Sequence, residues 1–170
     1  GTFWVNLPDF ASSVETIQLQ RGVGTSTNGS AAFGASLNLE TDAIQKEAFT
    51  SLASSFGSFN TFKNTLKFST GILNDHFTFS GRLSQINSDG YVDRASSNLD
   101  AYYLQATFKD ENTLIKALVF GGQEITYQSW YGLDPITLVS DRTYNPAGEI
   151  YDHNGIRTSF YDNQVDNYSQ

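Results

Sequence analysis

Long runs of alternating apolar and polar residues constrain the fold of this 170-residue chain more than any other feature of its sequence. The clearest run is Phe77–Ser88, and further runs cover 62–72 and 99–109. Alternation with a period of two residues is typical of β-strands that have one apolar and one polar face. These runs are long for a globular sheet, because strands of globular proteins average about five to six residues. The sequence therefore predicts an all-β protein with long strands.

The strand lengths and the spacing of the turns favour a membrane barrel. At about 3.3 Å per residue, Phe77–Ser88 rises about 40 Å, and a tilt near 45° reduces this to about 28 Å, close to the thickness of a hydrocarbon core. The predicted connections are short at 74–75, longer at 89–97, short at 110–112 and very long after Gln128. Outer-membrane barrels combine short turns on one side with long loops on the other. We therefore expect strands of an antiparallel, up-and-down transmembrane β-barrel at 48–56, 62–72, 77–88, 99–109 and 113–127.

The alternation also predicts which side chains share a face. In the run 99–109, Tyr102, Leu104 and Phe108 fall on one face and are expected to face lipid. Tyr103, Gln105 and Lys109 fall on the other face and are expected to face the barrel lumen or a domain inside it. The run 113–127 has apolar residues at both parities, so its two faces cannot be assigned from the sequence.

A different pattern precedes the alternating runs. It comprises Val14-Glu15-Thr16-Ile17-Gln18-Leu19-Gln20-Arg21-Gly22, then Asn28-Gly29-Ser30-Ala31-Ala32-Phe33-Gly34, then Leu37-Asn38-Leu39-Glu40-Thr41. The pattern resembles the end of the plug domain of TonB-dependent outer-membrane receptors, where it leads into the first strand of a barrel of about 22 strands. The resemblance implies that 1–41 is the C-terminal part of a plug domain and 42–47 a linker. It implies that 48–170 is the first five or so barrel strands, with a long external loop at 129–170. We expect the chain to be a portion of a larger receptor, because an open sheet leaves an unpaired edge in lipid.

The resemblance also implies a function and its partners. Such a receptor takes up a scarce nutrient, an iron complex or another large ligand, across the outer membrane of a Gram-negative bacterium. Its energy comes from the TonB energy-coupling protein, through a box expected outside this chain. Lipid and lipopolysaccharide would surround the barrel, and a surface lipoprotein is a further candidate partner. No bond of the ligand is made or broken, so we expect neither enzymatic activity nor a cofactor.

Two sets of residues are candidates for functional contacts. Exposed aromatic side chains beside Asn and Asp suit the mouth of a small-molecule site, and the final loop supplies Trp130, Tyr131, Tyr144 and Tyr151. The resemblance places Arg21 in the plug, facing the inner wall of the barrel. There a buried guanidinium needs a carboxylate partner, which lies outside the chain or is Glu124.

Composition and motif content argue against several other classes of function. A formal net charge of −8 disfavours nucleic acid as a partner. The chain has no Cys, and its two His residues lack the spacing of a metal site. No catalytic triad or nucleophile motif is visible. The remaining alternatives are a soluble β-sandwich module that binds carbohydrate and, less favoured, a β-rich hydrolase.

Overall fold

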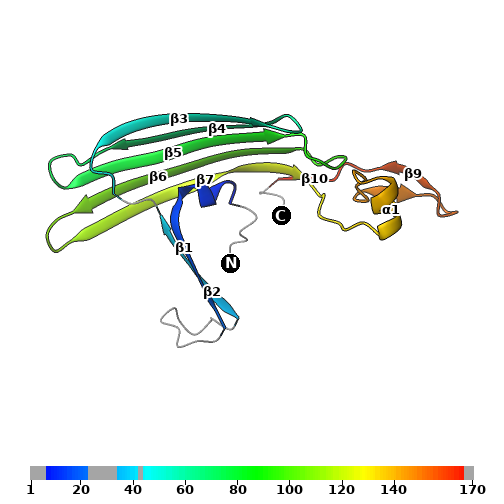
Figure 1. The fold of residues 1–170 in the computed structure, drawn as a ribbon, viewed down its shortest axis with the longest axis horizontal. Helices are drawn as coiled ribbons and strands as arrows, with labels where there is room; N and C mark the ends of the chain where they lie inside the picture. Colours follow the sequence, from blue (N-terminus) through cyan, green and yellow to red (C-terminus); the bar gives the residue numbers. More distant parts are fainter. Residues whose placement is uncertain (1–6, 23–33, 42–43, 167–170) are drawn as a thin grey trace.

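The body of the structure is one long, curved antiparallel sheet (Figure 1). The computed structural model describes residues 7–22, 34–41 and 44–166. Six strands form the sheet in the order β10-β7-β6-β5-β4-β3, so that β3 to β7 each pair with their neighbour in the chain. The strands are β3 Ala48–Gly57, β4 Thr61–Thr70, β5 Phe77–Ser88, β6 Ser97–Lys109, β7 Leu114–Tyr127 and β10 Gln164–Asp166. The predicted all-β, antiparallel class of fold is confirmed.

The alternating runs predicted the strand bounds closely. β5 coincides with the predicted run, and β6 begins two residues before the predicted start at 99. The register also resolves the faces of β7, because Phe120 lies opposite Tyr103 and Val119 lies opposite Leu104. Three apolar side chains, Leu114, Leu118 and Phe120, fall on the concave parity of β7, and the ring of Phe120 packs on Phe10 of the N-terminal segment, with 4.8 Å between the ring centroids.

The two faces of the sheet differ sharply in chemistry. Leu104 is 44% exposed, whereas Tyr103 and Gln105 beside it are 2% and 3% exposed. The exposed face carries large apolar side chains, among them Leu52, Phe56, Phe62, Phe77, Phe79, Leu83, Tyr102, Leu104, Ile115 and Val119. The opposite face buries the polar side chains of Ser69, Thr78, Arg82, Ser84, Gln105 and Thr107. The predicted separation of Tyr102 and Leu104 from Tyr103 and Gln105 is confirmed, while Lys109 is exposed at the end of β6.

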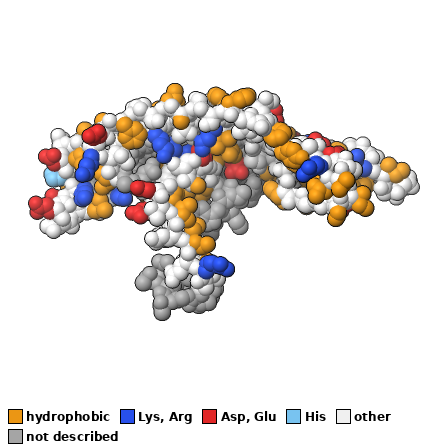
Figure 2. Space-filling view, in the orientation of Figure 1, with side chains coloured by type: hydrophobic (Ala, Val, Ile, Leu, Met, Phe, Trp, Pro, Cys, Tyr) orange, Lys and Arg blue, Asp and Glu red, His pale blue; other side chains and the backbone are white. Residues whose placement is uncertain are grey.

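The N-terminal part of the chain lies on the concave side of this sheet (Figure 1). It begins with a short 3-10 helix, η2 (Phe10–Ser13), followed by β1 (Val14–Arg21) and β2 (Ala35–Thr41). These two strands form a separate antiparallel sheet and do not join the main one. Of the loop between them, residues 23–33 lie outside the described residues, as do residues 42 and 43 of the predicted linker. Figure 2 shows hydrophobic side chains along the convex side of the main sheet and Lys and Arg side chains beneath it.

The segment after β7 has more structure than the sequence predicted. It contains α1 (Pro135–Ser140) and the hairpin of β8 (Glu149–Tyr151) and β9 (Arg157–Phe160), all beyond one end of the main sheet (Figure 1). The side chain of Asp134 caps α1 by accepting hydrogen bonds from the backbone N–H groups of Ile136 and Thr137, at 2.9 and 3.1 Å. The chain then returns to the sheet as β10, which pairs with the end of β7.

Gly122 of β7 lies where a side chain would collide first with the backbone of β6 and then with the N-terminal segment. A Cβ atom at this position would lie 2.0 Å from the carbonyl oxygen of Asp100 and 2.9 Å from Cγ of Pro8. We expect Gly122→Ala to lower the free energy of unfolding by about 1–3 kcal/mol, the usual cost of overpacking. Gly57→Ala is the control, because its Cβ would make an ordinary 3.6 Å contact with Thr61. Urea unfolding of the intact protein, followed by circular dichroism, measures both; equal losses would contradict the packing described here.

Candidate functional site: a carboxylate held by two cations on the concave face

The site centres on Asp9, in the turn that leads into η2. Asp9 has left-handed backbone angles, with φ 50° and ψ 21°, a region that Asp tolerates better than most residues. The backbone N–H of Ser12 donates to the Asp9 carbonyl oxygen at 3.2 Å, and the Ser12 hydroxyl donates to the Asp9 carboxylate. The turn therefore presents the Asp9 side chain to the sheet.

Two strands supply cations to this carboxylate. Lys63 of β4 lies with its Nζ atom 2.9 Å from Oδ1 of Asp9, and Arg82 of β5 pairs through Nη1 with Oδ2. Lys63 and Arg82 point to the same, concave face. Arg82 lies directly opposite Lys67, and Lys63 is four residues from Lys67 on the same strand. The Asp9 carboxylate thus fastens the N-terminal segment to two adjacent strands at once.

Arg82 is the buried centre of this arrangement. Arg82 is 2% exposed, and each of its guanidinium nitrogens donates a hydrogen bond. Nε donates to the Ser13 hydroxyl at 2.8 Å, Nη1 donates to the Ser84 hydroxyl at 2.9 Å, and Nη2 donates to the Asp9 carbonyl oxygen at 2.7 Å. A buried charge that loses its partner costs about 3–5 kcal/mol. The N-terminal segment is therefore needed to keep Arg82 in its buried position.

The ionisation of Asp9 reflects these contacts. Burial alone raises the pKa of Asp9, but hydrogen bonds from Ser12 and Lys63 and the charge of Arg82 outweigh it and lower the pKa to about 2. The carboxylate is therefore ionised at any physiological pH, and the contact is not a pH switch in that range.

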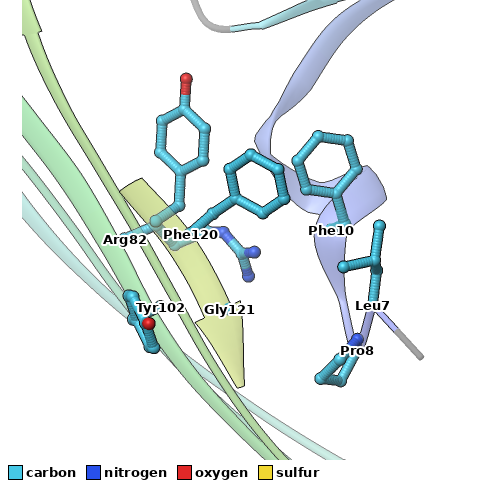
Figure 3. A pocket seen from close by; sticks show the side chains of 8 residues that line it. Leu7, Pro8, Phe10, Arg82, Tyr102, Phe120 and Gly121 are labelled. Carbon is cyan, nitrogen blue, oxygen red and sulfur yellow. The ribbon is translucent and has the colours of Figure 1, made fainter. Parts of the chain in front are cut away.

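The space around Arg82 does not suit a ligand. A cavity of about 10 Å³ lies between the N-terminal segment and the sheet, lined among others by Leu7, Pro8, Phe10, Arg82 and Phe120 (Figure 3). This is about the volume that a single water needs. The arrangement is thus a packed contact between two parts of the chain, with an aromatic pair beside an ion pair.

A row of uncharged, hydrogen-bonded side chains on β6 adds to the contact between the sheet and the N-terminal part of the chain. The Tyr103 hydroxyl donates to Oε1 of Gln105 at 2.8 Å, and Nε2 of Gln105 donates to the Thr107 hydroxyl at 3.3 Å. Thr41, at the end of β2, donates to the same Gln105 oxygen at 3.5 Å. The hairpin of β1 and β2 is therefore held near its base, where it meets the concave face.

The structure brings two of the four predicted ligand-binding residues together. The hydroxyls of Tyr144 and Tyr151 both donate to the carboxylate of Glu149, that of Tyr151 at 2.8 Å. The hydrogen bond from Tyr151 to Glu149 raises the pKa of Tyr151. Arg157 pairs with Glu149 at 3.4 Å and lies over the ring of Tyr144. Trp130 and Tyr131 are 66% and 56% exposed in the segment between β7 and α1, and within the described residues no side-chain hydrogen bond or ion pair joins them to this cluster.

A second arginine ties this cluster to the end of the sheet. The guanidinium of Arg94 stacks 3.7 Å from the ring centroid of Phe160 and donates to the Ala147 carbonyl oxygen at 3.1 Å. Nδ2 of Asn145 donates to the Gln128 carbonyl oxygen at 3.2 Å. These contacts hold the segment that contains β8 and β9 against the ends of the main-sheet strands and their connections.

The predicted contact between Arg21 and Glu124 is not present among the described residues. Arg21 is exposed and pairs with Ala35 at the far end of the hairpin, whereas Glu124 lies on β7. The arginine that the structure buries against a carboxylate is Arg82, and its partner is Asp9. The alternation within 77–88 puts Arg82 among the polar residues of its strand, but no local pattern points to Asp9, 73 residues away.

Within 7–22, 34–41 and 44–166, no cluster of three or more His, Asp or Glu residues could hold a metal ion. No helix in the same ranges is long and apolar enough to cross a membrane. No protein-family model, curated protein or solved structure matches the chain.

Removing the Asp9 charge tests the contact. We expect Asp9→Asn to destabilise the docked N-terminal segment by about 3–5 kcal/mol, because Arg82 stays buried without its counter-charge. Glu149→Gln is the control, since it removes the charge of a carboxylate that pairs with Arg157 beside the β8–β9 hairpin, beyond the end of the sheet and away from residues 10–14. Hydrogen exchange of the amides of residues 10–14 measures the loss. Unchanged exchange in Asp9→Asn would mean that the segment is held by packing alone.

The pKa of Asp9 predicts how this contact depends on pH. Because the folded pKa of about 2 lies below the ordinary value of 3.8, the stabilisation is complete above about pH 4 and is lost as the pH falls through 2. Hydrogen exchange of residues 10–14, corrected for intrinsic rates, should therefore be constant from pH 5 to 8 and faster toward pH 2. Asp9→Asn should remove the acid dependence; a midpoint near pH 4 in the unaltered protein would contradict the assignment.

Proposed function

We propose that this chain is the junction between the plug and the first barrel strands of a TonB-dependent outer-membrane receptor, which takes up a nutrient. One observation carries the proposal: the faces of the sheet are reversed relative to a water-soluble sheet protein. The apolar face is exposed and the polar face is buried under the N-terminal segment. A barrel in lipid needs this arrangement, because its outer surface meets hydrocarbon and its lumen holds polar groups.

The dimensions of the sheet support the proposal. β3 to β7 contain 10 to 14 residues each, and about 9–11 tilted residues span a bilayer. Short turns join β4 to β5 and β6 to β7 at one end. The longer β5–β6 connection and the segment that contains α1, β8 and β9 lie at the other end (Figure 1). On this proposal the second end is extracellular, and the edge strands β3 and β10 continue into further barrel strands.

The Asp9 contact then has a role in transport. The N-terminal segment and the hairpin of β1 and β2 belong to the plug, and Lys63 and Arg82 belong to the inner wall of the barrel. Ligand would enter past the extracellular segment, where Tyr144, Glu149, Tyr151 and Arg157 form a hydrogen-bonded cluster and Trp130 and Tyr131 are exposed. The energy-coupling protein would have to move or distort a plug that is fastened through Asp9. We propose no catalytic step and no cofactor.

A soluble carbohydrate-binding β-sandwich is the second candidate, and the same observation disfavours it. A sandwich buries the apolar faces of two sheets against each other. No second sheet of the described residues covers the apolar face, where Leu104 and Val119 are 44% and 59% exposed. A hydrolase gains no support either, because within the described residues the concave face presents an ion pair in a packed contact rather than an open cleft.

Spin labels on neighbouring positions of β7 test the proposal. The chain has no Cys, so single cysteines can be introduced at Val119 on the apolar face and at Lys116 on the polar face. In the full-length receptor in bilayers, we expect the label at position 119 to collide mainly with dissolved oxygen. The label at position 116 should collide mainly with a water-soluble nickel chelate. Equal access of the chelate to both positions would reject a membrane barrel, and shielding of position 119 from both reagents would favour a sandwich.

A further inference from the structure

The charges on the concave face of the main sheet are unequal. On β3 to β7, Glu124 is the one acidic residue of this face, beside five cations: Lys63, Lys67, Arg82, Lys109 and Lys116. Glu124 shares a row with Lys63 but lies three strands away, about 14 Å at the usual spacing of about 4.8 Å between strands. These strands therefore have no carboxylate of their own beside Lys63 and Arg82.

The carboxylate that neutralises Lys63 and Arg82 belongs to a different part of the chain. Asp9 supplies it from the N-terminal segment, toward which the guanidinium of Arg82 points in Figure 3. On the proposed function this segment is plug, which has to move or distort when ligand passes. Its departure would leave the pair of cations, one of them 2% exposed, without a counter-charge. An anion from outside the sheet would remove that cost.

The contacts of Asp9 show which anion fits. Its carboxylate accepts from Nζ of Lys63 at 2.9 Å through Oδ1, and from Nη1 of Arg82 through Oδ2. Its main-chain carbonyl oxygen accepts from Nη2 of the same guanidinium at 2.7 Å. Two carbons, Cβ and Cα, separate the two carbonyl carbons of Asp9, as two methylene carbons do in succinate. The site thus suits a carboxylate that has a second carbonyl oxygen two carbons away.

The charge and the exposure of the site also favour an anion. Burial alone would raise the pKa of Asp9, yet hydrogen bonds from Ser12 and Lys63 and the charge of Arg82 lower it to about 2. The site therefore favours the ionised form of an acid placed there. The side chain of Lys63 is 32% exposed, so Lys63 forms the open side of the site and Arg82 its buried side.

We propose that Lys63 and Arg82 form a binding site for carboxylic acids of the succinate type, which Asp9 occupies at rest. A ligand with this group takes the place of Asp9 when the N-terminal segment moves. The inference rests on the proposed function, because it takes this segment to be a plug that moves. It adds the chemical class of the ligand, an acid rather than a neutral sugar or a cation. The Asp9 contact then acts as an internal competitor that keeps the site closed.

Succinate and succinamide, which share a carbon skeleton but differ in charge, are the probes. Asp9→Ala in the full-length receptor opens the site, and calorimetric titration at fixed ionic strength should detect binding of succinate and none of succinamide. Adding Lys63→Met should weaken succinate binding about tenfold or more, because one hydrogen bond between charged groups is lost. The control is Lys116→Met in the same Asp9→Ala background. Lys116 lies on the same face but outside the Asp9 contact, so affinity should be unchanged.

A second measurement uses the unaltered receptor and does not depend on the folding of a variant. Succinate that binds only after Asp9 leaves multiplies the open population by one plus the ratio of its concentration to its dissociation constant. Hydrogen exchange of the amides of residues 10–14 should therefore quicken in proportion to added succinate. At about ten times the dissociation constant found in Asp9→Ala, exchange should be about tenfold faster, and succinamide should have no effect.

Four results would overturn the inference. They are no binding of succinate by folded Asp9→Ala, equal affinity after Lys63→Met, sulfate bound as tightly as succinate, and exchange of residues 10–14 that succinate does not change. None of these results bears on whether the convex face is in a membrane, which the spin labels on β7 decide separately.

Discussion

The buried guanidinium of Arg82 is the constraint on which the rest of the structure depends. A cation that is 2% exposed must be neutralised, and the carboxylate that does so comes from the N-terminal segment rather than from the sheet. This requirement holds η2 against β4 and β5, brings Phe10 onto Phe120, and places the base of the β1–β2 hairpin beside Gln105. The concave face can therefore be polar and still be well packed.

The covered concave face has a consequence for the convex one. Asp9, Ser12 and Ser13 satisfy polar groups beneath the sheet, and most of the large apolar side chains of β4 to β6 lie on the side that the described chain leaves exposed. In water, an exposed apolar surface that extends over five strands would be an aggregation site. In lipid, such a surface is the expected exterior of a barrel. The same division leaves Asp100 as the one charged side chain on the convex face of β3 to β7.

Sequence alternation predicted what is local and missed what is distant. Period-two patterning gave the bounds of β5, the faces of β6 and the concave position of Arg82, because each follows from side chains pointing alternately to either side of a strand. It could not find Asp9, whose turn has no periodic pattern. Arg21 was favoured instead because it belongs to the plug-like motif, and the structure leaves it exposed. Tyr144 and Tyr151 meet through Glu149, which no local pattern predicts. The start of α1 does have a local signal, because Asp134-Pro135 is a typical N-cap followed by Pro.

The central claim is that one face of this sheet meets hydrocarbon while the other is covered by the N-terminal segment. Labelling of the full-length protein in bilayers with an apolar diazirine, activated by light and mapped by mass spectrometry, tests it most directly. The account predicts carbene adducts at Phe79, Leu83, Leu104 and Val119, and none at Thr78, Arg82, Ser84 and Gln105 on the same strands or their neighbours. Adducts shared equally by the two sets, or absent from the first set, would contradict it.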